Sequence, residues 1–360
     1  MASKVRVLCG SVVRQEPQVL EAYLKSLKAL KVPAKVELDF AFMCDSEGNY
    51  PDLINFSMDT GACVFDADPR PTDAAYAVGA DTHHWTIATF EHLARQKQQL
   101  LDYAVKEGYD CIFLVDSDLL LEPTTLTNLL HCNAPIVSAV FWTPWQNGGD
   151  YMPQVWLKHP YEMHGLGMKD HEFIGALQQR KLLRVAGGGA CTLIHRDVIA
   201  AGAGYWPRVE GLPADGMWQG EDRTFALKAE RRHFRQYACA FNDIYHAYHP
   251  QQRTQAALDA AWEKLSVPRQ LCTKYGDYVH FTIDPLEEPE FQARADPTSR
   301  SHRGRVGGFK VLPEIEDALL DMTVGDERIM ELRFPPWYEI RNYANTTKTV
   351  LLKLVDVKPC

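Results

Sequence analysis

The sequence predicts an α/β protein built on a mostly parallel central sheet, followed by a small α+β domain. In the first third of the chain, continuous apolar runs alternate with stretches whose apolar residues recur at helical spacing. Continuous apolar runs are typical of parallel strands that helices cover on both faces. Beyond about residue 272 the pattern changes to strands around one short helix, so we expect domains at 1–272 and 273–360.

The first elements follow from the residues in order. The run VRVLCGSVV at 5–13 predicts a buried strand, and the helical spacing at 16–30 predicts a helix packed on it. A second strand is expected at 35–44, and it ends at DSEGN, a cluster of turn-forming residues. A helix at 86–108, ended by Gly108, and a strand over YDCIFLV continue the alternation.

The ends of the predicted strands are the expected place for a ligand. In sheets of this kind, ligands bind beyond the carboxyl ends of the strands. Three segments are expected along that edge, namely Gly10–Arg14, Cys44–Ser46 and Asp116–Asp118. We therefore expect their polar side chains, Ser11 and Arg14 among them, to contact a ligand.

The second half of the chain is less regular. Residues 141–180 are rich in Trp, Pro, Gly and His, which is typical of a substrate-facing insertion or of irregular packing. A glycine cluster opens the segment 186–199, which is expected to continue into a strand, and 220–234 predicts a helix with an acidic start. For the C-terminal domain we expect a strand, an arginine-rich turn region, a helix and two further strands.

Charge and hydropathy exclude several classes of function. The chain has 38 Lys and Arg against 47 Asp and Glu, a net charge of −9, so no overall positive field attracts nucleic acid. No apolar run approaches the length of a membrane-spanning helix, and the first residues do not form a signal peptide. We expect a cytoplasmic protein with no nucleic-acid partner and no membrane span.

Two carboxylates follow the third predicted strand. Asp116 and Asp118 stand on either side of Ser117 in FLVDSDLLLEP. Carboxylate oxygens so spaced suit Mg²⁺ or Mn²⁺, with diphosphate oxygens filling the remaining positions. The same spacing fits two solvated acids that cap the next turn. The motif alone therefore leaves both interpretations open.

The neighbouring segments favour the metal. A helix leads into the D-x-D strand at 95–123, followed by GGGACTLIHRDV at 187–198, GEDRTFALKAERRHFRQYA at 220–238 and YHAYH at 245–249. In this order they resemble the GT-A fold, a Rossmann-like fold of nucleotide-sugar-dependent glycosyltransferases. The resemblance covers about residues 5–250.

The resemblance implies a metal site. Asp118 is expected to ligate the metal directly, and Asp116 to contact the metal or the donor ribose. Either His246 or His249 is expected to be the third protein ligand, and an imidazole ligand favours Mn²⁺ over Mg²⁺. Each histidine fits a hydrogen-bonded structural role equally well.

The resemblance also implies a donor pocket. It places Asp45 and Arg95 near the nucleobase. Ser11, Arg14 and Ser117 lie at the same expected edge and complete the donor-binding set. A turn-stabilising role for Asp45 and a surface helix position for Arg95 are the alternatives.

On the acceptor side, Glu221 and Asp222 stand where the family keeps an acidic pair. Asp222 is expected to be the base that takes the proton of the attacking hydroxyl. Gly188 and Gly189 are expected to allow close approach of the acceptor, and Trp218 to stack on a sugar face. An ordinary helix start, a tight turn and loop packing are the alternatives for these residues.

The last part of the chain carries a second resemblance. GDYVHFTI at 276–283, the segment 311–338 and KTVLLKLVDVK at 348–358 look like the FKBP-type prolyl-isomerase fold of trigger-factor-like proteins. A Phe-Asp pair on the early strand is missing. The resemblance therefore implies a peptide- or acceptor-docking domain, or a structural appendage, in preference to a working isomerase.

Together these features predict a metal-dependent glycosyltransferase of the hexosyltransferase type. It is expected to use a nucleotide-diphosphate sugar, with a UDP-sugar favoured, and a carbohydrate or protein acceptor. One alternative is a peptide-binding chaperone or prolyl-isomerase-like protein with a degenerate sugar-nucleotide domain. A sugar nucleotidyltransferase is the other alternative, although CGSVVRQEP has only one arginine where that class carries a basic, glycine-rich loop.

Overall fold

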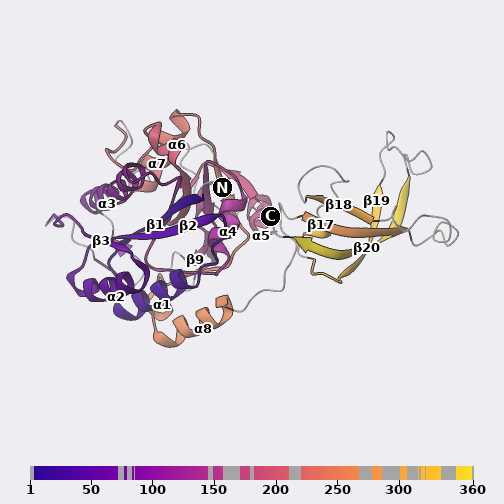
Figure 1. Ribbon diagram of the computed structural model, residues 1–360, viewed down its shortest axis with the longest axis horizontal. Helices are drawn as coiled ribbons and strands as arrows, with labels where there is room; N and C mark the ends of the chain where they lie inside the picture. Colours follow the sequence, from indigo (N-terminus) through magenta and orange to yellow (C-terminus); the bar gives the residue numbers. More distant parts are fainter. Residues whose placement is uncertain are drawn as a thin grey trace. The chain divides into compact units, whose positions relative to one another are not determined.

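The chain folds into two compact units, Met1–Val267 and Pro268–Cys360, each with its own hydrophobic core (Figure 1). The domain boundary expected at residues 272 and 273 lies outside the described residues. The computed structural model describes residues 4–71, 77–78, 83–84, 86–144, 149–156, 171–178, 182–210, 220–266, 278–285, 301–305, 315, 318–320, 322–333 and 346–358.

One eight-stranded sheet forms the centre of the first unit, in the order β12, β15, β8, β14, β6, β1, β2, β3. Four neighbouring pairs are parallel, and β14 is antiparallel to β6 and β8, as β12 is to β15. The expected mostly parallel central sheet is confirmed. In chain order its strands are β1 (Val5–Val13), β2 (Val36–Cys44), β3 (Cys63–Asp66), β6 (Cys111–Val115), β8 (Ile136–Ala139), β12 (Leu182–Val185), β14 (Cys191–His195) and β15 (Gln236–Cys239).

Short strands and helices complete this unit. The short strands are β4 (Ala77–Val78), β5 (His83–His84), β7 (Leu119–Leu121), β9 (Trp142–Pro144), β10 (Tyr151–Pro153), β11 (Val155–Trp156), β13 (Gly187–Gly188) and β16 (Ile244–His246). The helices are α1 (Pro17–Lys28), α2 (Tyr50–Thr60), α3 (Ile87–Lys106), α4 (Thr125–His131), α5 (His171–Gln178), α6 (Arg196–Ala200), α7 (Glu221–Arg231) and α8 (Gln255–Ser266), with 3₁₀ turns at Glu47–Asn49 and Pro250–Gln252.

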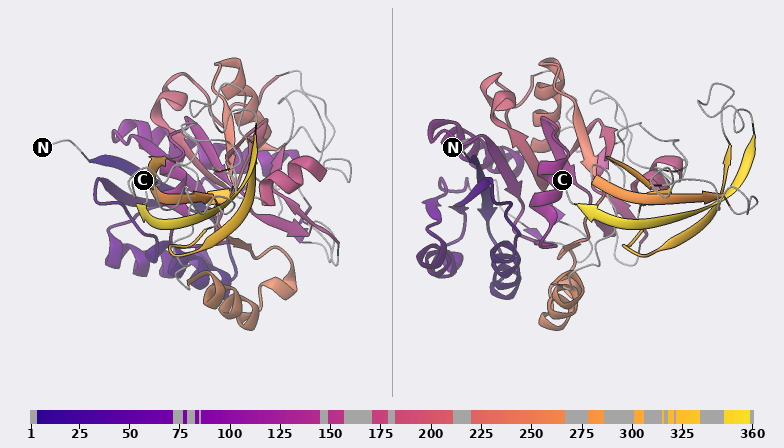
Figure 2. Two further views of the ribbon diagram at one scale, coloured as in Figure 1. Left: turned by 90° about the vertical axis from the view of Figure 1, so that its right-hand side faces the viewer. Right: turned by 45° about the vertical axis from the view of Figure 1, so that its right-hand side comes forward.

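Helices cover both faces of the sheet, as Figure 2 shows. Successive side chains of a strand point to opposite faces. Accordingly, Val7 and Cys9 of β1 pack with α1, α2 and α4, whereas Leu8 packs with α3, α6 and α7. One apolar core therefore lies on each face of the sheet. This is why most positions of the strands, and not only alternate ones, are apolar.

Helix α3 agrees closely with the sequence. Thr86 caps it by accepting a hydrogen bond from the backbone N–H of Thr89, and Gly108 follows it at a φ of +75°. Both features stabilise helix ends, since the threonine satisfies a free N–H and glycine adopts positive φ at low cost. Helices α2 and α8 were not expected. The polar DSEGN cluster leads directly into α2, whose end at Gly61 also has a positive φ of +76°.

The second unit contains a four-stranded antiparallel sheet in the order β18, β17, β20, β19. Its strands are β17 (Tyr278–Pro285), β18 (Ser301–Arg305), β19 (Glu327–Arg333) and β20 (Thr347–Lys358). Residues Ile315 and Leu319 are helical and pack on Val279 and Phe281 of the sheet. The arginine-rich residues 301–305, expected in a turn region, form strand β18, because the edge of a sheet tolerates charged side chains.

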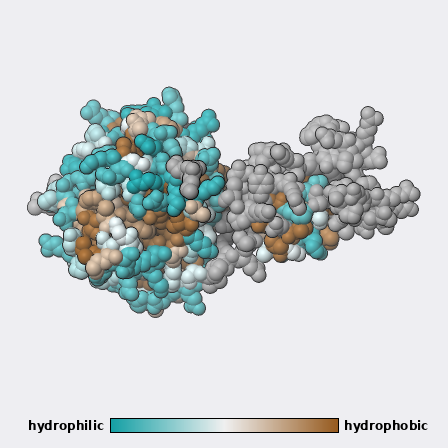
Figure 3. Space-filling view, in the orientation of Figure 1, coloured by the Kyte–Doolittle hydropathy of each residue, from teal (hydrophilic) through white to brown (hydrophobic). Residues whose placement is uncertain are grey.

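The surface of the first unit is mixed in polarity. On the face shown in Figure 3, hydrophilic residues surround patches of apolar ones. Among the helices in the described ranges, none is both long and apolar enough to cross a membrane.

Candidate active site

A cavity of about 630 Å³ lies at the carboxyl ends of β1, β2 and β6. The structure brings the three expected segments together there, because β1 pairs in parallel with both β2 and β6. Helices α3 and α7 and the end of β16 form the other walls. The lining residues are Val12, Arg14, Gln15, Asp45, Arg70, Thr89, Phe90, His92, Leu93, Asp116, Ser117, Asp118, Phe141, Gln154, Gly189, Ala190, Gly220, Glu221, Asp222, Arg223, His246 and Tyr248.

Asp45 lies at one end of the cavity, directly after β2. Its buried carboxylate accepts hydrogen bonds from Arg70 Nη2 and from His92 Nε2, the latter at 2.9 Å. Burial alone would raise the pKa of Asp45, but the hydrogen bonds from His92 and Arg70 outweigh it and lower the pKa. Arg14 Nη1 donates to the backbone carbonyl of Asp45 at 3.3 Å. This end of the cavity therefore holds a fixed carboxylate with cationic groups around it.

The D-x-D segment forms a tight turn between β6 and β7. The N–H of Asp116 donates to the carbonyl of Ala190 at 2.7 Å, and the N–H of Leu119 donates back to the carbonyl of Asp116 at 3.2 Å. Ser117 is buried and its Oγ donates to the carbonyl of Val12 at 3.2 Å. All three residues of this turn line the cavity.

His246 is placed beside Asp118 by strand pairing. Strand β16 pairs with β7 so that His246 lies opposite Leu119, and the N–H of Ala247 donates to the carbonyl of Asp118 at 2.9 Å. His246 Nε2 is 3.2 Å from Asp118 Oδ2. Its Nδ1 hydrogen-bonds Thr143 Oγ1 at 2.7 Å, which fixes the orientation of the ring. The imidazole and the carboxylate are thus held as a pair in the cavity wall.

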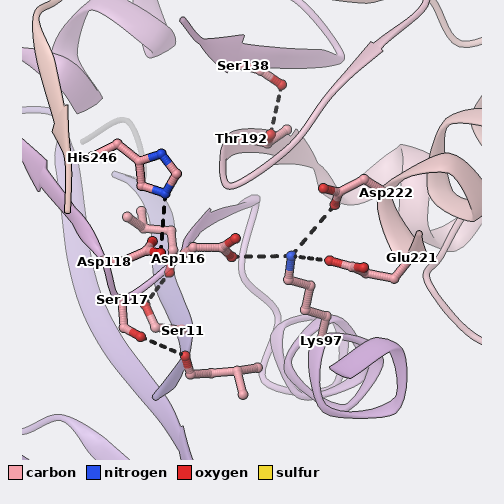
Figure 4. Close-up of polar contacts among 12 residues, drawn as sticks. Ser11, Lys97, Asp116, Ser117, Asp118, Ser138, Thr192, Glu221, Asp222 and His246 are labelled. Carbon is pink, nitrogen blue, oxygen red and sulfur yellow. Dashed lines mark hydrogen bonds and ion pairs between the residues drawn. The ribbon is translucent and has the colours of Figure 1, made fainter. Parts of the chain in front are cut away.

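Three carboxylates converge on Lys97, as the close-up in Figure 4 shows. Its Nζ is 2.8 Å from Glu221 Oε1, 3.2 Å from Asp116 Oδ1 and 3.6 Å from Asp222 Oδ1. Lys97 is 3% exposed and lies on α3, whereas the acids come from α7 and the end of β6. Glu221, Asp222 and Asp116 therefore share one cation.

The pKa values in this cluster are displaced from their ordinary values. Burial raises the pKa of Asp222 to about 8, and the charges of Glu221 and Asp116 add to this rise against the opposing charge of Lys97. Burial also raises the pKa of Asp116, although Lys97 acts against it. Burial disfavours the ammonium of Lys97, but the three carboxylates outweigh burial and raise its pKa well above the usual value.

The two glycines expected to face an acceptor lie in different surroundings. Gly189 lines the cavity, and a Cβ there would overlap the carboxylate of Asp222, with Asp222 Cγ only 2.6 Å away. Gly188 does not line the cavity. A Cβ at Gly188 would lie 2.7 Å from Ser138 Oγ, so this glycine is needed for close packing of β13 on the sheet. Only Gly189 is placed to affect an acceptor.

Ser11 does not line the cavity, contrary to the expectation of a donor contact. Its Oγ donates to the carbonyl of Val115 at 2.6 Å and hydrogen-bonds the hydroxyl of Tyr23 on α1. The alternation of the strand explains this placement. Val12, the next residue, points into the cavity, so Ser11 points into the core on the opposite face.

Arg95 also lies outside the cavity wall. It forms an ion pair with Glu91 one helical turn earlier at 3.6 Å, and its guanidinium carbon lies 4.3 Å from the ring centroid of Trp206. Near Asp45, the cavity is lined by the basic residues Arg14 and Arg70. Arg95 instead occupies a surface position on α3, which was the alternative interpretation of this residue.

His249 is not a ligand candidate in the structure. Its Nε2 hydrogen-bonds the carbonyl of Pro144, and its side chain accepts from the backbone N–H of Gln252. The side chain is therefore fully used in holding the turn after β16, and His246 alone of the two histidines faces the D-x-D segment. Trp218, expected to stack on a sugar, lies outside the described residues.

Sequence reasoning missed Lys97, His92 and Arg70. The signal for Lys97 was its position three residues before Leu100, on the buried side of α3, where a charged residue needs a partner. His92 lies on the same buried side. Arg70 follows β3 in a stretch without periodicity, and nothing in the sequence connects it to Asp45.

Several solved structures are similar to the chain. TarS of S. aureus, residues 1–349, is 10% identical with a TM-score of 0.38, and the match covers 66% of this chain and 58% of that one. GalNAc-T7 with UDP, GalNAc and Mn²⁺ is 11% identical (TM-score 0.44; 72% and 48% covered). The mannosyltransferase PcManGT from Pyrobaculum calidifontis in complex with GDP-Man and Mn²⁺ is 14% identical (TM-score 0.38; 66% and 56% covered). The chain matches about half the length of these proteins.

No curated protein matches the chain. Residues 4–144 match the family model described as glycosyltransferase family 25, N-terminal domain. The matched segment includes Asp45, Asp116 and Asp118 and ends before Asp222 and His246. Residues 4–144 are therefore similar to a glycosyltransferase domain, which supports the enzyme class expected from the sequence.

Proposed function

We propose that the protein transfers a sugar from a nucleotide-diphosphate donor to a hydroxyl of a carbohydrate or protein acceptor, with a divalent metal. One observation carries this proposal. A single cavity joins the D-x-D acids and His246 to the acidic pair Glu221 and Asp222, so a donor phosphate and an acceptor hydroxyl fit side by side. The family match of residues 4–144 supports the same activity.

The donor nucleotide is proposed to lie between Asp45 and the D-x-D turn. Asp45 is ionised, because its pKa is lowered, and it is oriented by Arg70 and His92. A fixed carboxylate accepts hydrogen bonds from the N–H groups of a nucleobase, and arginines pair with phosphate oxygens. A UDP-sugar is the donor favoured by the sequence resemblance.

Two of the residues present fit a divalent metal whose remaining ligands come from the donor. Within the described ranges, no group of three His, Cys, Asp or Glu side chains is arranged to hold a metal without it. Asp118 and His246 supply an oxygen and a nitrogen 3.2 Å apart, and Thr143 orients the imidazole, as metal-ligating histidines require. Diphosphate oxygens would complete the shell. When bound, the cation stabilises the negative charge of the departing diphosphate.

Asp222 is proposed as the base. It lines the cavity at the start of α7, with Gly189 leaving room beside its carboxylate. In a transfer with inversion, the acceptor oxygen attacks the anomeric carbon while Asp222 takes the hydroxyl proton and the diphosphate leaves with the bonding electrons. Lys97 and Glu221 lie beside Asp222 and take no part in the bonds that change.

The test of this function is donor hydrolysis and transfer across a panel of nucleotide sugars with Mn²⁺, Mg²⁺ or a chelator. We expect one UDP-sugar to be hydrolysed with Mn²⁺ and not with the chelator. Failure to turn over any donor would contradict the proposal. Release of pyrophosphate from a nucleoside triphosphate and a sugar phosphate would instead identify a nucleotidyltransferase.

The second unit is proposed to dock a peptide or acceptor. The resemblance of this unit to FKBP-type isomerases is a prediction from the sequence. The GT-A fold of the first unit is likewise a prediction from the sequence. The antiparallel sheet with Ile315 and Leu319 packed on it supports a domain with its own core. A peptide-binding chaperone with an inactive first unit would show peptide binding and no donor turnover.

A further inference from the structure

Lys97 is a buried cation that has no role in the bonds made and broken in the proposed reaction. It lies on the side of α3 that faces the sheet, in line with Leu100 and Leu101, and it is 3% exposed. Burying an ammonium group is costly unless charged partners surround it. Its partners come from α7 and from the end of β6, two segments more than 100 residues apart in sequence. The lysine therefore joins the two halves of the cavity.

Structural stability alone does not explain this arrangement. Buried ion pairs contribute little net stability, because desolvation offsets the attraction, and apolar residues of similar size often replace them without loss. Here one ammonium meets the carboxylates of Asp116, Glu221 and Asp222, which leaves an excess of negative charge in the cavity. Such a cluster is more typical of a functional site than of a stabilising one.

The three distances distinguish the acids. Glu221 at 2.8 Å and Asp116 at 3.2 Å are within hydrogen-bond distance of the Lys97 ammonium, whereas Asp222 Oδ1 is at 3.6 Å. In the described part of the chain, Asp222 Oδ1 makes no hydrogen bond. Gly189 borders the other side of this carboxylate. The charge of Lys97 and the space beside Gly189 thus determine where the Asp222 carboxylate lies, and its Oδ1 accepts no hydrogen bond from the described residues.

We propose that Lys97 is a positioning residue that favours the ionised form of Asp222 and keeps its carboxylate directed into the cavity, while Glu221 and Asp116 hold the ammonium in place. This inference rests on the proposed function, in which Asp222 is the base. When Asp222 takes the acceptor proton, Lys97 keeps all of its own protons. Among the described residues, the cluster is also faced by Asp118, by Arg223 of α7 and by Tyr205, whose ring centroid is 5.5 Å from Lys97 Nζ.

The test compares Lys97→Met, Lys97→Arg and the control Lys106→Met, an exposed lysine of the same helix. We expect Lys97→Met to lower kcat by roughly 10²-fold while the Kd for the nucleoside diphosphate changes only about threefold. Without the cation, the acidic limb of the kcat/KM profile should move to higher pH, because Asp222 then holds its proton more strongly. Lys97→Arg should restore most of kcat, and Lys106→Met should match the wild type.

A second variant covers the case in which Lys97→Met does not fold. The double variant Lys97→Met/Glu221→Gln removes the cation together with its nearest anion, and Glu221→Gln alone is its control. We expect the double variant to melt close to the wild type, and to show a lower kcat and a pH limb at higher pH than Glu221→Gln alone, because the two proteins differ only in the cation.

Two results would overturn the inference while the wild type still turns over donor. One is near-normal kcat with an unmoved pH limb in either Lys97→Met protein. The other is a loss of donor affinity as large as the loss of kcat, which would make Lys97 a donor-binding residue. An inactive wild type would instead overturn the proposed function on which the inference rests.

Discussion

At the scale of single residues, Asp118 combines a partly exposed carboxylate with one neighbouring imidazole. Its side chain is 17% exposed and pairs with His246, and it makes no contribution to the apolar cores. A residue of this kind affects ligand binding more than folding. Asp116 differs from Asp118 because its carboxylate forms an ion pair with the buried Lys97.

The first prediction concerns this residue. Asp118→Asn should abolish the Mn²⁺-dependent part of nucleoside-diphosphate binding, because an amide is a poor ligand for the cation, and should change the melting temperature by only a few degrees. Calorimetry with Mn²⁺ and with a chelator measures it. Asp66→Asn, at the exposed end of β3 outside the cavity, is the matched control. Unchanged affinity in Asp118→Asn would remove Asp118 from the metal site.

The second prediction concerns Asp222 and pH. With its pKa raised to about 8, Asp222 is largely protonated in the free enzyme at neutral pH, and a base must be ionised to act. Therefore kcat/KM should rise about tenfold per pH unit and level off above pH ~8. Asp222→Asn should keep donor affinity, lose roughly 10²-fold or more in turnover and lose this limb. A variant with normal turnover would transfer the role of base to Glu221.

At the scale of elements, the reversed strand β14 determines how the cavity wall around Gly189 is built. Cys191, its first residue, lies opposite Val115, the last residue of β6. Gly189 and Ala190 therefore enter the cavity from the start of a strand, whereas Asp45 and Asp116 enter from strand ends. Helix α7 then brings Asp222 against Gly189.

The third prediction concerns this contact. Gly189→Ala should displace the Asp222 carboxylate, because the added Cβ would overlap it, and should lower turnover by about tenfold or more with little change in donor affinity. Steady-state kinetics and calorimetry measure the two effects. Gly175→Ala on α5 is the control, since a Cβ there meets no atom within 4 Å. Equal turnover in both variants would show that the contact is not needed.

The elements predicted from sequence are those with a continuous local signal. Strand β1 matches its predicted bounds, 5–13, because a strand between two cores is a nearly continuous apolar run. The direction of β14 was not predictable, since strand direction depends on pairing partners far away in sequence. Residues 196–200 at the end of the expected strand form helix α6, capped by His195.

The residues of the candidate site that directly follow strands were predictable from the sequence. Asp45, Asp116 and Asp118 line the cavity because the topology of a parallel sheet brings strand ends together. Ser11 was expected in the cavity but points to the opposite face of the sheet, because neighbouring residues of a strand point to opposite faces. Lys97 was missed because its partners lie on other elements, so that only the three-dimensional contact reveals its role.

At the scale of the whole molecule, the candidate site lies within the first unit. Each described residue assigned to donor, metal or base precedes Pro250 and belongs to Met1–Val267. The second unit has a separate core built on β17, β19 and β20. Separate cores are what independent folding requires.

The fourth prediction follows from this division. A chain ending at Val267 should remain folded and hydrolyse donor as the full-length protein does, because its site is complete. Transfer to a large natural acceptor should fall if the second unit docks that acceptor, since binding of distant groups positions the reacting hydroxyl. Donor hydrolysis and transfer by both proteins decide it. Equal transfer would remove the docking role, and lost hydrolysis would make the second unit part of the catalytic fold.

The reversal of β14 has a consequence for how such enzymes diverge. Strand β8 leaves the sheet at the edge where β14 re-enters it, because the two strands are antiparallel neighbours. A change of chain length between Val140 and β12 therefore leaves the pairing of β8 with β14 unchanged. The entropy cost of a longer loop grows only slowly with its length. Under the proposed function, a different length of this segment would change the acceptor that binds, while Asp45, Asp116 and Asp118 would keep their positions at the strand ends.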